Sequence, residues 1–444
     1  MLIRPRPRWT ARFVLCWTTA ALPFSTVAQG QLAPDAKPSL LGRTVKPTYG
    51  DELADQQKQE EAENAALAAQ AAERVTRFGA LPADAPAEVR EEFQRLVGEL
   101  RTAMAAVRRE YSQHQTSIDL DPEGPRQWFE AVEKADAAFA AWLGRMAELY
   151  NTDPTRYQDF GLTMMEVVRV ETALDRTENL LEPAKAVFAN PPAKLDPPLL
   201  LHIGYVGYTQ GDYDLAKSAW DAFQEDAVLP AEYKTFYGSI DELRERWHRE
   251  LAQREADKLR NNPIAVLQTN KGLVTIELFE DQAPNAVANF LYLANHDYFK
   301  RMPIFRVIPR YCVQTGCING DGTGNAGYQI AGENQRSDRR DVFRGSLAFA
   351  LGVDPATGEP MSDTASSQFL IATTPLPGLN DSLTVFGRVI DGQFLLGTFN
   401  KVDLSDEEQR KDPSRRATVL IDAKVEEKRN HEYRPEVIRG ELPF

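Results

Sequence analysis

Two loop-like stretches in the C-terminal half of the chain match motifs that known chemistries use. Gly322-Thr323-Gly324-Asn325-Ala326-Gly327 fits the glycine pattern of a dinucleotide-binding loop. That pattern also requires a following helix and an acidic residue about 20 positions on, which this sequence does not supply. An overlapping stretch places Asn319, Asp321, Thr323 and Asn325 in the alternating manner of calcium ligands, but no bidentate glutamate stands at its twelfth position. The glycines therefore predict a loop without a nucleotide or calcium site.

Serine and cysteine residues are the next candidates for chemistry. Ser366 and Ser367 have only His296 as a histidine in the same region, so a serine hydrolase triad is not predicted. Cys312 and Cys317 have no further imidazoles nearby and do not make a zinc shell. The two cysteines are either buried free thiols or a disulfide that needs a turn at Thr315 and Gly316. We expect no metal and no cofactor.

Arg306 and Gln314 form a third candidate pair. Arg306 stands in the apolar stretch Phe305–Ile308, and Gln314 follows eight positions later. A guanidinium offers a rigid, permanently charged fork of N–H donors. Taken alone, an arginine in an apolar strand is more often half of a structural ion pair, so the elements around it decide its role.

Those elements change character at Asn262 and Pro263. Before this point the apolar residues recur at three and four positions; after it, short β-branched runs alternate with turns. Strands are predicted at 264–269, 273–279, 304–308, 312–315, 346–350, 368–373, 383–389 and 418–425. Helices are predicted after Ala283-Pro284 and at 393–400. The expected fold is a closed antiparallel β-barrel with two flanking helices.

The region upstream of the barrel is predicted to be helical. Amphipathic spacing appears from Ala87 to Tyr111, around 126–150 and around 160–189. The stretch Leu201–Pro230 resembles one tetratricopeptide-type helix pair, although further copies at a fixed period are not found. Two interpretations are open: the helical region binds a partner protein, or it serves only as a spacer.

The N-terminus predicts export. Arg4, Arg6, Arg8 and Arg12 precede an apolar run that is shorter than a membrane helix, and small residues end at Ala28. We expect a signal peptide over 1–28, a flexible linker over 29–84, a helical domain over 85–261, the barrel domain over 262–427 and a tail over 428–444. An uncleaved anchor is the alternative. After cleavage, we expect a periplasmic or other extracytoplasmic protein without an integral membrane segment.

Composition limits the partners. With 65 acidic and 51 basic side chains, the formal net charge is −14. Such a balance attracts neither phosphate backbones nor anionic lipid surfaces. Nucleic-acid binding is not predicted.

The barrel region resembles the cyclophilin family. The blocks that carry the resemblance follow in the family's order over about 165 of the 444 residues: Gly272–Leu278 with Ala283-Pro284, Phe305–Gln314, Gly322–Gly324 with Gly332-Glu333, Ser346–Ala350, Ser366–Ile371 and Thr384–Val389. Together these blocks are specific, whereas each alone is weak. The resemblance implies a peptidyl-prolyl cis-trans isomerase that acts on proline-containing polypeptides.

The resemblance also implies roles for single residues. Arg306 would donate to the prolyl nitrogen, and Gln314 would hold the substrate backbone or Arg306. The residues expected to line the substrate site are Tyr311, Cys312, Ala350, Gln368, Phe369, Leu370, Leu379 and Leu383. The alternative for the aromatic side chains is a place in the barrel core. We also expect the Cys312 thiol to be reactive and shielded by a bound peptide.

Two positions depart from the family's usual pattern. Gly378 and Leu383 stand where cyclophilins commonly have tryptophan and histidine. Weak binding of cyclosporin-type inhibitors, and lower or altered activity, are expected. The alternative function is therefore a non-catalytic protein that binds proline-containing segments through a degenerate pocket.

Overall fold

The computed structural model describes residues 81–117, 126–353, 356, 360–412 and 417–444. The predicted signal peptide and all but the last four residues of the predicted linker lie outside these ranges. Residues 81–444 form one compact unit. Within the described ranges, no helix combines the length and apolarity that crossing a membrane requires.

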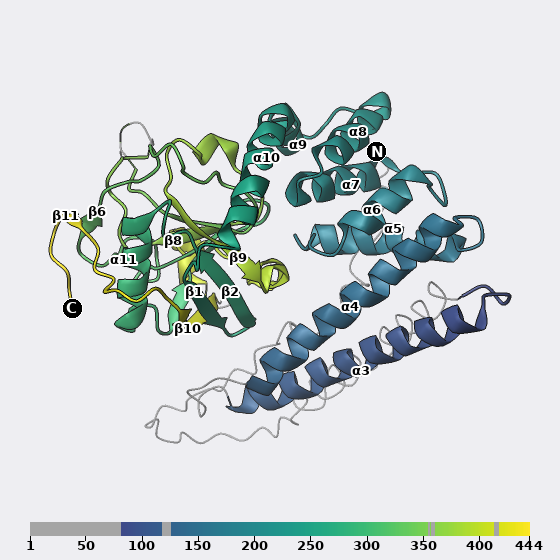
Figure 1. Cartoon of the computed structure of the whole chain (residues 1–444), viewed down its shortest axis with the longest axis horizontal. Coiled ribbons are helices and arrows are strands. Elements are labelled where there is room, and N and C mark those ends of the chain that lie inside the picture. The colour runs from purple at the N-terminus through teal and green to yellow at the C-terminus, as the bar shows by residue number, and fades with distance from the viewer. Residues whose placement is uncertain (1–80, 118–125, 354–355, 357–359, 413–416) are drawn as a thin grey trace, which may run out of the picture. The chain divides into compact units, whose positions relative to one another are not determined.

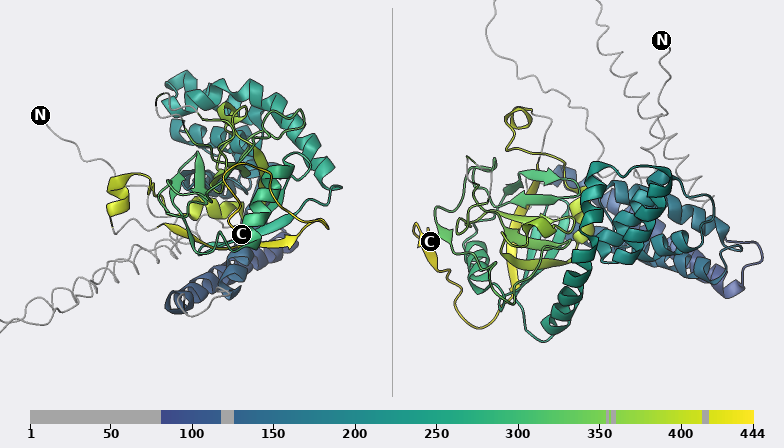
Figure 2. Two further views of the ribbon diagram at one scale, coloured as in Figure 1. Left: turned by 90° about the vertical axis from the view of Figure 1, so that its left-hand side faces the viewer. Right: turned by 90° about the horizontal axis from the view of Figure 1, so that it is seen from above.

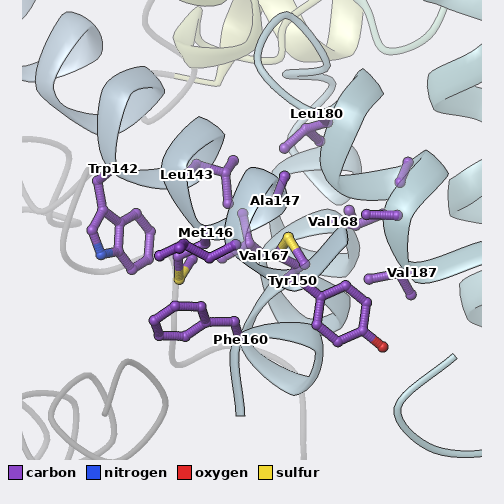
Figure 3. Close-up of a cluster of buried hydrophobic side chains, with 14 of the residues drawn as sticks. Trp142, Leu143, Met146, Ala147, Tyr150, Phe160, Val167, Val168, Leu180 and Val187 are labelled. Atoms are coloured by element: carbon purple, nitrogen blue, oxygen red, sulfur yellow. The ribbon is translucent and has the colours of Figure 1, made fainter. Parts of the chain in front are cut away.

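Four helices form the first part of this unit. Helices α3 (Ala87–Ser117) and α4 (Arg126–Thr152) lie side by side (Figure 1). Helices α5 (Gln158–Ala173) and α6 (Leu181–Ala189) pack against α4. Apolar side chains from α4, α5 and α6 meet in a shared core (Figure 3). The three predicted helical stretches are confirmed, with the third divided into α5 and α6.

Helices α7 (Pro197–Gln210) and α8 (Tyr213–Asp226) form the predicted helix pair. Gly211, in the left-handed region at φ 80°, ends α7. Gly204 permits close contact between the helices, because a Cβ atom there would lie 2.1 Å from Nε1 of Trp220. The relation of this pair to tetratricopeptide repeats stays a prediction. Helices α9 (Ala231–Gly238) and α10 (Ile240–Asp257) follow.

Nine strands form the barrel sheet in the order β3-β10-β1-β2-β9-β7-β8-β5-β4. The strands are β1 (Ile264–Thr269), β2 (Gly272–Leu278), β3 (Met302–Ile304), β4 (Arg306–Ile308), β5 (Cys312–Thr315), β7 (Ser346–Phe349), β8 (Phe369–Ala372), β9 (Val385–Asp391) and β10 (Thr418–Glu427). The edge strands β3 and β4 are separated only by Phe305, and Thr315 Oγ1 donates to the Pro303 carbonyl at 3.0 Å. The predicted barrel is therefore present and nearly closed.

Two helices accompany the barrel. Helix α11 (Pro284–Asn295) begins with proline, as the sequence predicts, and buries Phe290 and Leu291. The predicted helix at 393–400 is a 3₁₀ helix, η3 (Gln393–Thr398). A second short 3₁₀ helix, η2 (Pro377–Leu379), and the helix α12 (Glu407–Lys411) lie in loops.

The C-terminal segment lies along the outside of the barrel (Figure 2). Its strand β11 (Val437–Arg439) pairs with β6 (Gln329–Ile330), and the Phe444 ring stacks on His296 with centroids 5.0 Å apart. The predicted tail is thus packed against the barrel domain.

Two buried arginines join the helical region to the barrel. Arg340, whose side chain is 0% exposed, contacts Glu250 and Asp257 of α10 at 3.0 and 2.9 Å. Arg344 contacts Asp175 at 3.2 Å and Glu178 at 2.8 Å. Although burial alone lowers the pKa of each arginine, these carboxylates raise it above its usual range. Both guanidiniums therefore stay charged where the two regions meet.

Candidate active site

A row of side chains crosses four strands on one face of the sheet. The register pairs Arg306 of β4 with Gln314 of β5. It then pairs Gln314 with Leu370 of β8, and Leu370 with Ala348 of β7. Because directly opposed residues of an antiparallel sheet point to the same face, these four side chains share one surface.

The other face of these strands points into the barrel. Val313, Thr315 and Ile371 line a small cavity there together with other apolar side chains. Phe369, one position before Leu370, is 0% exposed and packs against the rings of Phe290 and Phe299. The structure therefore places Phe369 in the core and does not bring it to the candidate site, which fits the alternative noted for the aromatic residues.

Arg306 is held from one side only. Its Nε donates to Oδ2 of Asp403 at 3.1 Å, and its side chain remains 40% exposed. Asp403 Oδ1 accepts in turn from the Ser405 backbone N–H at 3.1 Å. Among the described residues, no partner engages the Nη groups of Arg306. These donors are oriented by Asp403 and are accessible to a ligand.

A chain of amide contacts continues from Gln314. Its Nε2 donates to Oε1 of Gln368 at 3.1 Å. Gln368 Nε2 donates to the carbonyls of Gly322 and Gly324 at 2.8 and 2.9 Å. Gln368 therefore orients Gln314 and also fixes the glycine loop, which explains these glycines without a nucleotide.

An apolar floor lies beside the row. Cys312, Ala348, Leu370 and Leu383 belong to one buried cluster, against which Leu379 packs. Tyr311 stands at the edge of this floor and is 38% exposed. Ala350 is half-buried, and its N–H donates to the Gln368 carbonyl at 2.9 Å. The structure thus gathers the predicted site residues around this surface, with Phe369 as the exception.

Two side chains that the family pattern places at this site are replaced here by Gly378 and Leu383. Gly378 is exposed, and a Cβ atom built there would meet nothing within 4 Å. Leu383, the second departure from the family pattern, is buried in the floor. The site therefore lacks an aromatic group at Gly378 and a polar group at Leu383.

Two residues of the site were not predicted from the sequence. Ala348 lies two positions before the predicted Ala350, and of these two alanines it is the one that joins the row. Asp403 is 97 residues from Arg306 and follows no strand motif, so only the fold brings the two together. No local sequence signal could have identified Asp403.

The groups at this surface suit binding of a neutral, partly apolar ligand. A charged donor and an amide lie beside an apolar floor. In the part of the chain that the structure describes, no group of three or more His, Cys, Asp or Glu residues could hold a metal ion. The remaining candidate nucleophile is Cys312.

The structure contradicts the expected reactivity of Cys312. The residue is 2% exposed, and both Cys312 and Cys317 are free thiols. Burial raises the pKa of the Cys312 thiol to about 12, although the Arg306 guanidinium acts in the opposite direction. The thiol therefore stays protonated at neutral pH.

We expect iodoacetamide to modify Cys312 very slowly in the folded protein. At pH 7.5 the rate should be at least about 100-fold below that of a free thiol with a pKa near 8.5, and it should rise about tenfold per pH unit. Mass spectrometry of the Cys312 peptide, with a urea-unfolded sample as control, measures this. Rapid native modification at pH 7.5 would show that the floor opens to solvent.

Comparison with known proteins identifies the barrel. Residues 264–423 match the family model of the cyclophilin type peptidyl-prolyl cis-trans isomerases. A peptidyl-prolyl cis-trans isomerase of Helicobacter pylori is 34% identical over 31% of this chain and 80% of its own length. Isomerase B of Bacillus subtilis is 38% identical over 27% of this chain and 77% of its own length.

Two further matches are a plant isomerase and a solved structure. An Arabidopsis thaliana isomerase is 35% identical over 34% of this chain, which spans only 61% of that relative. The crystal structure of a Cryptosporidium parvum cyclophilin, determined in the presence of the dipeptide Ala-Pro, is 29% identical, with a TM-score of 0.30 over 37% of this chain and 99% of its own. Through the barrel at residues 264–423, the chain belongs to the cyclophilin family of peptidyl-prolyl cis-trans isomerases.

Proposed function

We propose that this protein isomerises X-Pro peptide bonds of exported polypeptides and that Arg306 stabilises the twisted amide. The observation that carries the proposal is the half-exposed Arg306 at the end of the row that continues through Gln314 and Leu370. Amide resonance imposes a rotational barrier of roughly 18–20 kcal/mol, and no bond needs to break. A donor and an apolar floor are the groups that such a reaction uses.

The proposed mechanism assigns each part of the surface a task. The proline ring would lie on the floor of Cys312, Leu370 and Leu383, beside Tyr311. An Nη group of Arg306 would donate to the prolyl nitrogen as its lone pair leaves resonance. That hydrogen bond is stronger in the transition state than in the ground state, so it accelerates rotation. Gln314, oriented by Gln368, would hold the substrate backbone.

A protease-coupled assay tests the activity directly. The full chain would be measured on tetrapeptides that differ in the residue before proline, with free peptide as the uncatalysed reference. Acceleration of at least one peptide supports the proposal. Uncatalysed rates for every peptide, at protein concentrations that bind them, would contradict it.

A second function is favoured by the incomplete wall. With Gly378 open and Leu383 apolar, the surface could hold proline-containing segments without isomerising them. NMR titration separates the two functions. A binder shifts the resonances of a peptide and leaves its cis-trans exchange rate unchanged. An isomerase shifts the resonances and also increases the exchange rate.

We expect Gly378→Trp to strengthen binding of a cyclosporin-type inhibitor. The space around the Gly378 Cβ position admits a ring, and the resemblance to cyclophilins assigns that inhibitor contact to tryptophan. A decrease of about tenfold in Kd, about 1.4 kcal/mol, fits one added aromatic contact. Isothermal titration calorimetry measures it. Gly98→Trp is the matched control, because Gly98 lies in α3 and a Cβ atom there would also meet nothing within 4 Å. Unchanged affinity for Gly378→Trp would show that the missing wall does not limit binding.

Export is proposed from the basic and apolar N-terminus. Fusion of residues 1–28 to a reporter that is active only outside the cytoplasm tests it, with the four N-terminal arginines replaced as control. A partner protein for the helical region is also a proposal, and it rests on the α7–α8 helix pair alone.

A further inference from the structure

The turn between β4 and β5 connects the two strands that carry Arg306 and Gln314. Arg310 occupies this turn in the left-handed region, at φ 57°. The Tyr311 N–H donates to the Ile308 carbonyl at 3.2 Å and closes the turn. Residues other than glycine are disfavoured at such φ values, so other contacts must stabilise Arg310 there.

Those contacts all come from the helical region. The Arg310 backbone N–H donates to Oδ2 of Asp175 at 3.0 Å, and its Nη1 donates to Oε1 of Glu232 at 2.7 Å. The guanidinium carbon lies 5.2 and 5.4 Å from the ring centroids of Tyr205 and Tyr233. An arginine between two tyrosine faces gains cation–π attraction as well as the ion pair.

Asp175 extends this attachment toward the next residue of the turn. Its Oδ1 accepts from the Tyr205 hydroxyl at 2.8 Å and from Arg344 at 3.2 Å. Arg344 also donates to the Thr373 carbonyl, and the Thr373 N–H donates to the Tyr311 carbonyl at 3.0 Å. The Pro309–Arg310 peptide group is therefore bonded directly to Asp175, and the Tyr311–Cys312 peptide group is connected to it through Thr373 and Arg344.

We propose that Arg310 is a positioning residue for the isomerase reaction, through which the helical region fixes the Tyr311 ring at the edge of the proline site. The inference rests on the proposed function, in which Tyr311 contacts the proline ring. Arg310 itself points toward α9 and away from the substrate floor. Its loss would let the turn move and would weaken substrate binding, while Arg306 keeps its ion pair with Asp403.

The test compares three full-chain variants in the peptide assay and in peptide titrations. Arg310→Gly removes the side chain and relieves the φ constraint, and Arg310→Lys keeps the charge opposite Glu232. Arg246→Gln is the matched control, because it breaks another contact between helical region and barrel, the 2.8 Å pair with Asp341, away from the turn.

We expect Arg310→Gly to raise KM and peptide Kd by about fivefold or more, with kcat within about twofold, because a contact made equally in ground and transition states changes KM alone. Arg310→Lys should recover part of the loss, and Arg246→Gln should leave KM within about twofold.

Several outcomes would overturn the inference. One is a wild-type KM for Arg310→Gly with only a lower Tm, since the contacts would then be structural. Another is an equal rise in KM for Arg246→Gln, which would indicate general loosening of the junction. An inactive wild type that still binds peptide would refute the isomerase function, and the Kd comparison would then test Arg310 independently. If Arg310→Gly does not fold, Glu232→Gln at the exposed end of the ion pair provides the same comparison.

Discussion

Replacement of Arg306 by alanine is expected to lower kcat/KM by about ten- to hundredfold, since a charge-assisted hydrogen bond contributes about 1.5–3 kcal/mol. The bond acts on the transition state, so kcat should fall and KM should change little. Arg306→Lys should recover little activity, because an ammonium does not reproduce the planar fork that Asp403 orients. The protease-coupled assay on one cleavable proline peptide measures all three proteins.

Thermal unfolding distinguishes this role from a structural one. The Arg306 side chain is 40% exposed, and such an ion pair contributes at most about 1 kcal/mol to stability. The Tm of Arg306→Ala should therefore stay within a few degrees of the wild-type value. Wild-type turnover by a folded Arg306→Ala protein would remove Arg306 from the mechanism, and an unfolded variant would make it structural.

Replacement of Arg340 by methionine is expected to destabilise the protein by about 3 kcal/mol or more, because breaking a buried ion pair leaves uncompensated charge. Arg340 neutralises Glu250 and Asp257, and its guanidinium carbon lies 3.9 Å from the centroid of the Phe279 ring. Methionine fills the volume without a charge. Arg254 and Arg260, which pair with Glu250 at 2.7 Å and with Asp257 at 3.0 Å, are partly exposed, and Arg388 lies 3.9 and 3.7 Å from the two carboxylates. These three arginines would compensate the buried charge only in part. Urea unfolding followed by circular dichroism measures the change.

Arg336→Met is the matched control for this experiment. Arg336 lies in the same loop and pairs with Asp338, but both side chains are more than two fifths exposed. Its loss should cost at most about 1 kcal/mol. Equal destabilisation by the two variants would mean that burial of the Arg340 pair adds nothing to stability.

The barrel strands could be predicted because their sequence signals are local. β-branched runs between turns predict Ile264–Thr269 and Cys312–Thr315 with the bounds that the structure has. The family blocks then placed Arg306, Gln314 and Leu370 on one surface. The side-chain direction of Phe369 could not be predicted, because adjacent residues of a strand face opposite sides and both faces are apolar here.

The junction between the helices and the barrel has no comparable signal. Arg344 and Asp175 are 169 residues apart, and each stands in a polar stretch that reads as an ordinary loop. Charged residues are usually solvated, so nothing in the sequence marks these as buried. Local sequence patterns therefore do not reveal the charged residues that connect the helical region to the barrel.

The order of synthesis gives this junction a time dependence. At about 5–20 residues per second, the 169 residues between Asp175 and Arg344 take about 10 to 30 s to emerge. During that delay the helices already exist while Asp175 and Glu178 have no guanidinium to face. The barrel sheet can form only later still, because β1 pairs with β10 near the end of the chain, with Ile264 opposite Glu427. A nascent chain thus exposes unneutralised carboxylates until Arg344 has emerged, and an unpaired strand edge until almost all of the chain has been made.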